Sequence, residues 1–133
     1  MVLIILLVLA LFVLQTLLPG SFRYLVGPNK SGGLMLALGP RDNPPPQTIL
    51  GGRAERALTN MQEALPVFLA LALLNLIVGS AALALTGATV FLVARTLYVP
   101  AYLAGIPLLR SLIWGAGVAG LVLMVGPLLV RTG

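Results

Sequence analysis

The segment "RAERALTNMQEALPVFLALALLNLIV", residues 53–78, joins a polar beginning to a strongly apolar end. Asn75 is the one polar side chain in its second half, residues 64–78. Over the whole chain, 59% of the residues are hydrophobic and 8% are charged, whereas about a quarter of the residues in soluble domains are charged. Apolar stretches of about 18 residues or more are typical of membrane-spanning helices. The sequence therefore predicts a single all-α integral membrane domain that spans residues 1–133.

Three further apolar stretches extend this interpretation to a bundle of four transmembrane helices. We expect the spans at about residues 1–18, 53–78, 81–99 and 107–130. Pro19-Gly20 should end the first span, and the Gly- and Pro-rich residues 19–52 predict an irregular connection. Within that connection, "GLMLALG" is too short to cross a membrane. The first stretch lacks the basic start and the cleavage pattern of a signal peptide, so we expect it to be retained.

The basic residues predict the orientation in the membrane. Seven of the eight lie in or beside the first and third connections, namely Arg23, Lys30, Arg41, Arg53, Arg56, Arg95 and Arg110, and the eighth, Arg131, lies in the C-terminal tail. By the positive-inside tendency, these connections face the cytoplasm and both termini lie on the opposite side, in the inner membrane if the source is a bacterium. The net charge of +5 does not require a nucleic-acid partner, and we expect none.

Several kinds of chemistry are excluded by composition. The chain has no cysteine and no histidine, and its carboxylates are Asp42, Glu55 and Glu63. Disulfides, a cysteine nucleophile and a histidine base are therefore ruled out, and we expect no metal site. Any reaction would need a reactive group that a cosubstrate supplies.

Polar side chains are nevertheless expected on one face of each of three spans, near the cytoplasmic side. They are Arg53, Arg56, Asn60 and Glu63, spaced 3, 4 and 3 apart; Arg95, Tyr98 and Tyr102, spaced 3 and 4; and Arg110, at the start of the fourth span. Such spacings place side chains on one face of a helix. Snorkelling arginines, an Arg56–Glu63 ion pair and interfacial tyrosines would explain single members. As a set, they predict a cleft between subunits for a small zwitterionic ligand rich in carboxylates.

Other residues of the spans have structural interpretations. Asn75 is expected to bridge helices by a hydrogen bond, and Gly115, Gly117 and Gly120 to allow close helix approach. Trp114 is expected in the core or facing lipid.

The pattern R-x-x-R-x-x-x-N-x-x-E-x-x-P, residues 53–66, resembles the signature of the MAPEG family. These are membrane-associated proteins of eicosanoid and glutathione metabolism, including microsomal glutathione transferases and leukotriene synthase. "ARTLYVPAYL" at 94–103 and "LLRSLIWGAG" at 108–117 are also similar to that family, so the likeness covers about residues 53–125.

The resemblance implies a homotrimer with glutathione bound between neighbouring subunits on the cytoplasmic side. Residues at positions that match glutathione contacts in the family are Arg56, Asn60, Glu63, Tyr98 and Tyr102, and Arg53 and Arg95 share their helix faces. Arg110 matches the region of the arginine proposed to stabilise the glutathione thiolate, and it is the expected catalytic residue. Leu58 and Ala64 depart from the pattern, since relatives often have a polar residue and a tyrosine there.

Three functional hypotheses remain open. The first is a glutathione-dependent transferase or peroxidase that acts on apolar electrophiles dissolved in the bilayer. The second is a non-catalytic lipid- or ligand-binding protein of the same fold, which Leu58 favours. The third is a small multidrug exporter, which usually depends on an isolated acidic residue deep in a span. Glu63 instead lies near the start of its helix beside Arg56 and Asn60.

Overall fold

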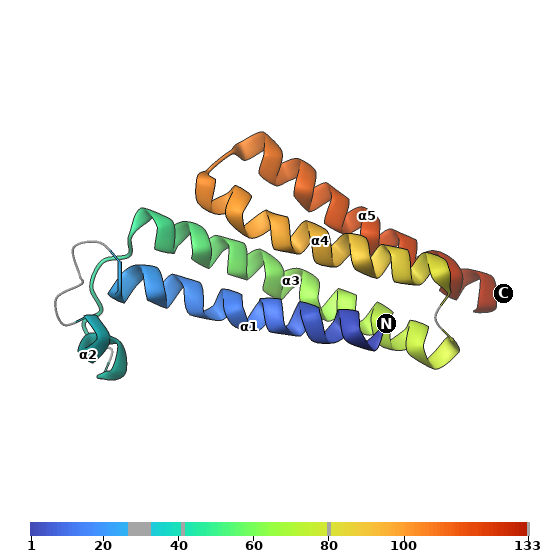
Figure 1. The fold of residues 1–133 in the computed structure, drawn as a ribbon, viewed down its shortest axis with the longest axis horizontal. Helices are drawn as coiled ribbons and strands as arrows, with labels where there is room; N and C mark the ends of the chain where they lie inside the picture. The colour runs from blue at the N-terminus through green and yellow to red at the C-terminus, as the bar shows by residue number, and fades with distance from the viewer. Residues whose placement is uncertain (27–32, 41, 80, 133) are drawn as a thin grey trace.

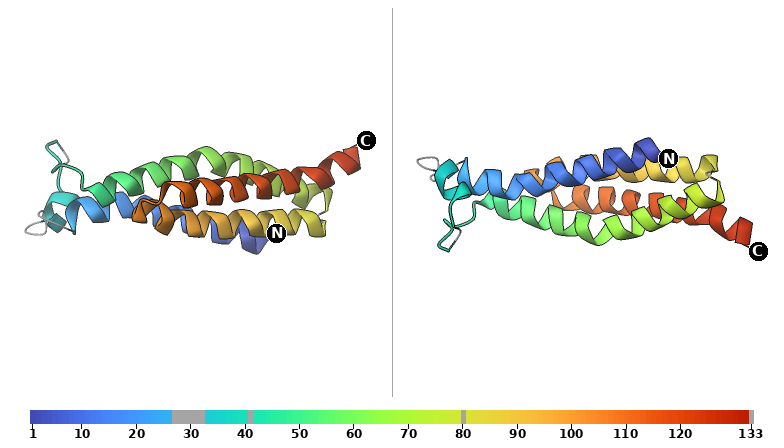
Figure 2. Two further views of the ribbon diagram at one scale, coloured as in Figure 1. Left: turned by 90° about the horizontal axis from the view of Figure 1, so that it is seen from above. Right: turned by 90° about the horizontal axis from the view of Figure 1, so that it is seen from below.

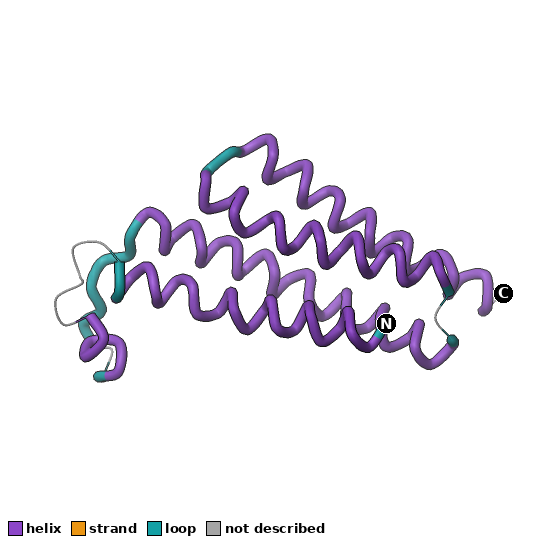
Figure 3. Tube along the Cα trace, in the orientation of Figure 1, coloured by secondary structure: helices purple, strands orange, loops and turns teal. Residues whose placement is uncertain are grey.

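The computed structural model describes residues 1–26, 33–40, 42–79 and 81–132. Within these residues every element is an α-helix (Figures 1 and 3). Four helices are long and apolar enough to cross a membrane. They are α1 (Val2–Tyr24), α3 (Ile49–Val78), α4 (Ala82–Ala104) and α5 (Pro107–Thr132), while α2 (Gly33–Leu38) is short. The prediction of an all-α membrane domain with four spans is confirmed.

The long helices form two antiparallel pairs, α1 with α3 and α4 with α5, that pack against each other (Figures 1 and 2). Both termini lie at the end where α3 passes into α4 (Figure 1). The connection that contains α2 and the α4–α5 connection point toward the opposite end (Figure 1). The basic residues that precede and follow these two connections are thus brought to one half of the molecule.

α1 and α4 are longer than the sequence pattern predicted, because proline does not end them. α1 continues through Pro19 to Tyr24, and α4 continues through Pro100 to Ala104. Each proline removes only its own backbone hydrogen bond, which membrane helices tolerate. The expected break at Pro19-Gly20 was therefore wrong.

Caps determine two of the boundaries near the polar half. α3 begins at Ile49 because the Thr48 hydroxyl accepts a hydrogen bond from the amide of Gly51 at 3.0 Å. This N-cap satisfies one of the amides that the first turn leaves without a helical partner. α4 ends at Gly105, whose φ of 74° is left-handed and suits glycine.

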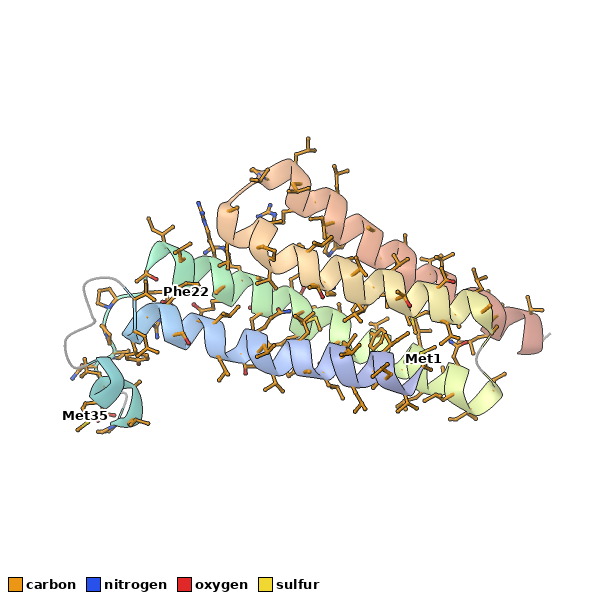
Figure 4. The ribbon with its side chains drawn as sticks, viewed as in Figure 1. Met1, Phe22 and Met35 are labelled. Carbon is orange, nitrogen blue, oxygen red and sulfur yellow. The ribbon has the colours of Figure 1, made fainter. Side chains whose placement is uncertain are left out.

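The core lies where α1, α3, α4 and α5 meet. The rings of Phe68 and Phe91 stack there, with centroids 4.6 Å apart. The buried Asn75 donates to the carbonyl oxygens of Leu71 and Met124 at 2.9 and 3.0 Å, so it bridges α3 and α5 as predicted. Many apolar side chains project outward along the bundle, as a lipid environment requires (Figure 4).

Candidate functional site

Two adjoining hollows lie where the first half of α3, the end of α4 and the start of α5 come together. The tyrosine hollow has a volume of about 570 Å³ and is lined by Asn60, Tyr98, Tyr102, Arg110, Ser111, Trp114 and Gly115. The arginine hollow has a volume of about 180 Å³ and is lined by Arg53, Arg56, Tyr102, Gly105, Ile106, Pro107 and Arg110. Tyr102 and Arg110 belong to both linings, so the two hollows share a wall.

Tyr102 is the centre of this shared wall. The guanidinium carbon of Arg110 lies 4.9 Å from its ring centroid, and that of Arg56 lies 6.0 Å away. The Tyr98 ring meets it edge-on, at 5.4 Å and 61°. A cation over an aromatic face is attracted by the ring's quadrupole. The ring therefore holds two arginines in place without neutralising their charges.

Arg53 has a different role, since it bridges α3 to the end of α4. Its Nη1 atom donates to the carbonyl oxygen of Leu103 at 2.7 Å. Its guanidinium also occupies the space where a Cβ on Gly105 would lie, 2.6 Å from Nη2. Arg53 closes the α4–α5 connection onto α3 and so shapes the arginine hollow.

Arg95 lies beneath the tyrosine hollow and does not line it. The residue is only 3% exposed, and its Nη1 atom donates to Asn60 Oδ1 at 2.5 Å. Its guanidinium carbon lies 5.1 Å from the Phe91 centroid and 5.6 Å from that of Tyr98. The arginine therefore contacts two lining residues, Asn60 and Tyr98, from below.

Glu63 is exposed on α3 and lines neither hollow. The Arg56–Glu63 ion pair considered above is not formed between these two described residues, and Arg56 is exposed as well. As a result, the two hollows together contain three arginines and no carboxylate. Among the described residues, no three acidic, cysteine or histidine side chains gather to hold a metal ion.

The structure adds four residues of α5 to the expected site, namely Ser111, Trp114 and Gly115 in the tyrosine hollow and Pro107 in the arginine hollow. Trp114 is 46% exposed, as a lipid-facing side chain would be, and it also borders the tyrosine hollow. Arg110 and Trp114 are four residues apart, so the helical spacing places them on one face. That spacing was the available sequence signal for the α5 side of the hollow.

Comparison with known families decides the identity of this bundle. The sequence model of the MAPEG family matches residues 1–130. The chain belongs to the MAPEG family. Membership in this family supports a membrane protein of glutathione or eicosanoid metabolism. The match covers α1 as well as the three helices that carry the motifs. No curated protein and no solved structure matches the chain. Of the motif residues that suggested MAPEG, Arg53, Arg56, Asn60, Tyr98, Tyr102 and Arg110 line the hollows, whereas Glu63 and Arg95 do not.

Proposed function

We propose that this MAPEG chain binds glutathione and activates its thiol for reaction with apolar electrophiles from the bilayer, as a transferase or peroxidase. The observation that supports this most is the charge of the two hollows. Arg53, Arg56 and Arg110 line them without a carboxylate, and the hollows share Arg110 and Tyr102. A positively charged, partly aromatic cleft of this kind suits an anionic peptide.

The sizes and donors of the two hollows suit the parts of glutathione. Glutathione carries two carboxylates, and the forked donors of arginine bind a carboxylate through two hydrogen bonds. Arg56 is exposed, so its guanidinium is open to such a partner in the arginine hollow. The tyrosine hollow, at about 570 Å³, is within the usual range of about 300–1,000 Å³ for small-molecule sites.

Arg110 is the proposed catalytic residue. When bound, glutathione supplies the sulfur nucleophile that this cysteine-free chain lacks. A cation beside a thiol lowers its pKa and favours the thiolate. Arg110 leans over the Tyr102 ring and borders both hollows, so its charge faces the space where the ligand would lie. A hundredfold gain in the ratio of thiolate to thiol requires about 2.7 kcal/mol of stabilisation.

The outer face of α3 supports assembly into an oligomer, and the resemblance to the MAPEG family implies that this oligomer is a homotrimer. Arg56 and Glu63 are both exposed on a helix that is apolar enough to span the membrane. Charged side chains that face lipid within a span are costly. A neighbouring subunit would cover this face and bring Glu63 to the ligand's ammonium group. In this proposal the polar half of the bundle faces the cytoplasm, as the basic residues predict.

Apolar electrophiles would reach the tyrosine hollow from the lipid. Trp114 lies at the border between that hollow and the outer surface of α5, where Leu112 is also exposed. A dissolved apolar molecule can therefore approach along α5 without crossing the arginine hollow.

The test is a glutathione titration of the detergent-purified protein, followed by the ultraviolet absorbance of the thiolate. We expect a saturable thiolate band in the wild type and in Thr86→Ala, an exposed α4 residue whose hydroxyl bonds only its own helix, to Ala82. Arg110→Ala should lose the band while it retains glutathione binding by calorimetry. Binding without a thiolate band in the wild type would support the non-catalytic alternative, and absence of binding would overturn the proposal.

A further inference from the structure

The arginine that lies beneath the tyrosine hollow has an unusual environment for a charged group. Arg95 is 3% exposed within the membrane-spanning helix α4. A side chain in that position must be partnered, because burying a charge without compensation is costly. It contacts the Asn60 amide oxygen and the faces of the Phe91 and Tyr98 rings. Two of these three partners, Asn60 and Tyr98, line the tyrosine hollow.

The bond between Arg95 and Asn60 determines which way the Asn60 amide points. Arginine has donors and no acceptor, so the atom that faces it must be the amide oxygen, Oδ1. The amide nitrogen, Nδ2, occupies the other branch of the side chain. It forms no hydrogen bond with the described residues. It is also not fully buried, because the buried polar atoms without a partner among these residues do not include it. Nδ2 is therefore available to the hollow that Asn60 lines.

We propose that Arg95 is a positioning residue, which holds the Asn60 amide so that its nitrogen donates to a hydrogen-bond acceptor in the tyrosine hollow. The acceptor is a carbonyl or carboxylate oxygen of the ligand. This deepens the proposed function and rests on it for the identity of the ligand. It also changes the expected role of Arg95 from direct contact with glutathione to support of a residue that makes the contact.

The surroundings of Arg95 explain how it holds a single geometry. The guanidinium lies against the rings of Phe91 and Tyr98 on its own helix. On α5, Gly117 presents bare backbone to it, since a Cβ there would lie 3.7 Å from Arg95 Nε. A planar cation packed between aromatic rings and a neighbouring helix has little rotational freedom. The packing of α3, α4 and α5 therefore fixes the orientation that Arg95 imposes on Asn60.

Three substitutions separate positioning from a general structural role. Arg95→Lys keeps a side chain that can donate a hydrogen bond to Asn60 Oδ1 and cannot accept one. Glutathione affinity should therefore stay within about threefold of wild type. Arg95→Met removes the donor and the buried charge, so affinity should fall by about tenfold, whereas the melting temperature should hold or rise. Asn60→Asp keeps an acceptor toward Arg95 and removes the nitrogen. It should retain the melting temperature and lose at least about tenfold in affinity.

The measurements are calorimetric glutathione titrations and thermal unfolding of the detergent-purified variants. Wild-type affinity in Asn60→Asp would overturn the inference, as would an Arg95→Met affinity that falls only together with the melting temperature. Thr86→Ala serves as the α4 control in both measurements, because its hydroxyl bonds only its own helix.

A third readout does not depend on glutathione. The side-chain amide of Asn60, assigned in nitrogen-15 spectra by its loss in Asn60→Asp, should give one sharp pair of proton signals in the wild type and in Arg95→Lys. In Arg95→Met the pair should shift and broaden, and an unchanged pair would overturn the positioning role. If the pair depends on Arg95 but glutathione neither binds nor moves it, the positioning stands and the proposed ligand fails.

Discussion

Arg53 Nη1 donates a hydrogen bond to the carbonyl oxygen of Leu103 at 2.7 Å, which joins residues 50 positions apart in the chain. The carbonyl belongs to the last turn of α4, where carbonyl oxygens have no amide donor within the helix. The same guanidinium lies against Gly105, whose left-handed φ of 74° ends the helix. A single arginine of α3 thus holds the connection that carries Arg110 into the site.

The first prediction concerns this connection. Arg53→Gln should shorten the side chain enough to lose the bond to Leu103, at a cost of about 1 kcal/mol. We expect faster hydrogen exchange at the backbone amides of residues 103–106 and a modest fall in the melting temperature. Thr59→Ala, an exposed α3 residue that bonds only its own helix, should leave the exchange unchanged. Unaltered exchange in Arg53→Gln would mean that α4 and α5 hold the connection without α3.

The second prediction concerns the close approach of α4 and α5 at Gly120. A Cβ on Gly120 would lie 2.7 Å from the Gly87 carbonyl oxygen and 2.9 Å from the Phe91 amide nitrogen. Both obstacles are backbone atoms, so Gly120→Ala must push the helices apart, at about 1–3 kcal/mol. The check is unfolding in detergent mixtures, read by circular dichroism.

Gly115→Ala is the matched control for that measurement, because a Cβ at Gly115 meets nothing within 4 Å. Alanine is the better helix former, so this variant should be as stable as the wild type or more stable by up to about 1 kcal/mol. Equal stability of the two alanine variants would contradict the tight helix contact at Gly120.

The third prediction concerns the bridge between α3 and α5. Asn75 is 1% exposed and donates to the carbonyl oxygens of Leu71 and Met124. Asn75→Leu keeps the branching of the side chain and removes the interhelical bond, so it should cost about 0.5–1.5 kcal/mol. Thermal unfolding measures this loss. Glutathione affinity should be unaffected, because Asn75 lies outside both hollows. A change in affinity without a change in stability would contradict this separation.

The fourth prediction concerns the charge of the arginine hollow. Arg56→Gln removes one of three cations from its lining, and a lost hydrogen bond to a charged ligand group should raise the glutathione Kd by about tenfold. Because salt screens charges near the surface, raising sodium chloride should weaken binding to the wild type more than to the variant. Calorimetric titration at two salt concentrations measures both effects. Parallel salt dependence in the two proteins would exclude a direct electrostatic role for Arg56.

Much of the candidate site was predictable from helical spacing. Arg56 and Asn60 lie four residues apart, as do Tyr98 and Tyr102, so each pair was expected on one face of its helix. The structure brings the four residues into the linings of two adjoining hollows. Spacing specifies a face on one helix, and it does not specify what packs against that face.

The positions of Arg95 and Glu63 did not follow from helical spacing. Both belong to the polar faces, yet Arg95 is buried under the site and Glu63 is exposed beside it. Arg95 is covered by α3 through Asn60 and by α5 through the bare backbone of Gly117. Gly115 shows the same limit, since it was grouped with Gly117 and Gly120 but a Cβ at its position would meet no atom within 4 Å.

The sequence by itself determined the membrane class, the four spans and the gathering of basic residues at one end. These properties follow from composition and from local periodicity, which depend on residues close together in the chain. Only the tertiary structure decided that Arg95 supports Asn60, that Arg53 holds Leu103, and that Tyr102 divides the site into two hollows. Each of these relationships joins different helices, and their geometry depends on how the helices pack, which periodicity along one helix does not specify.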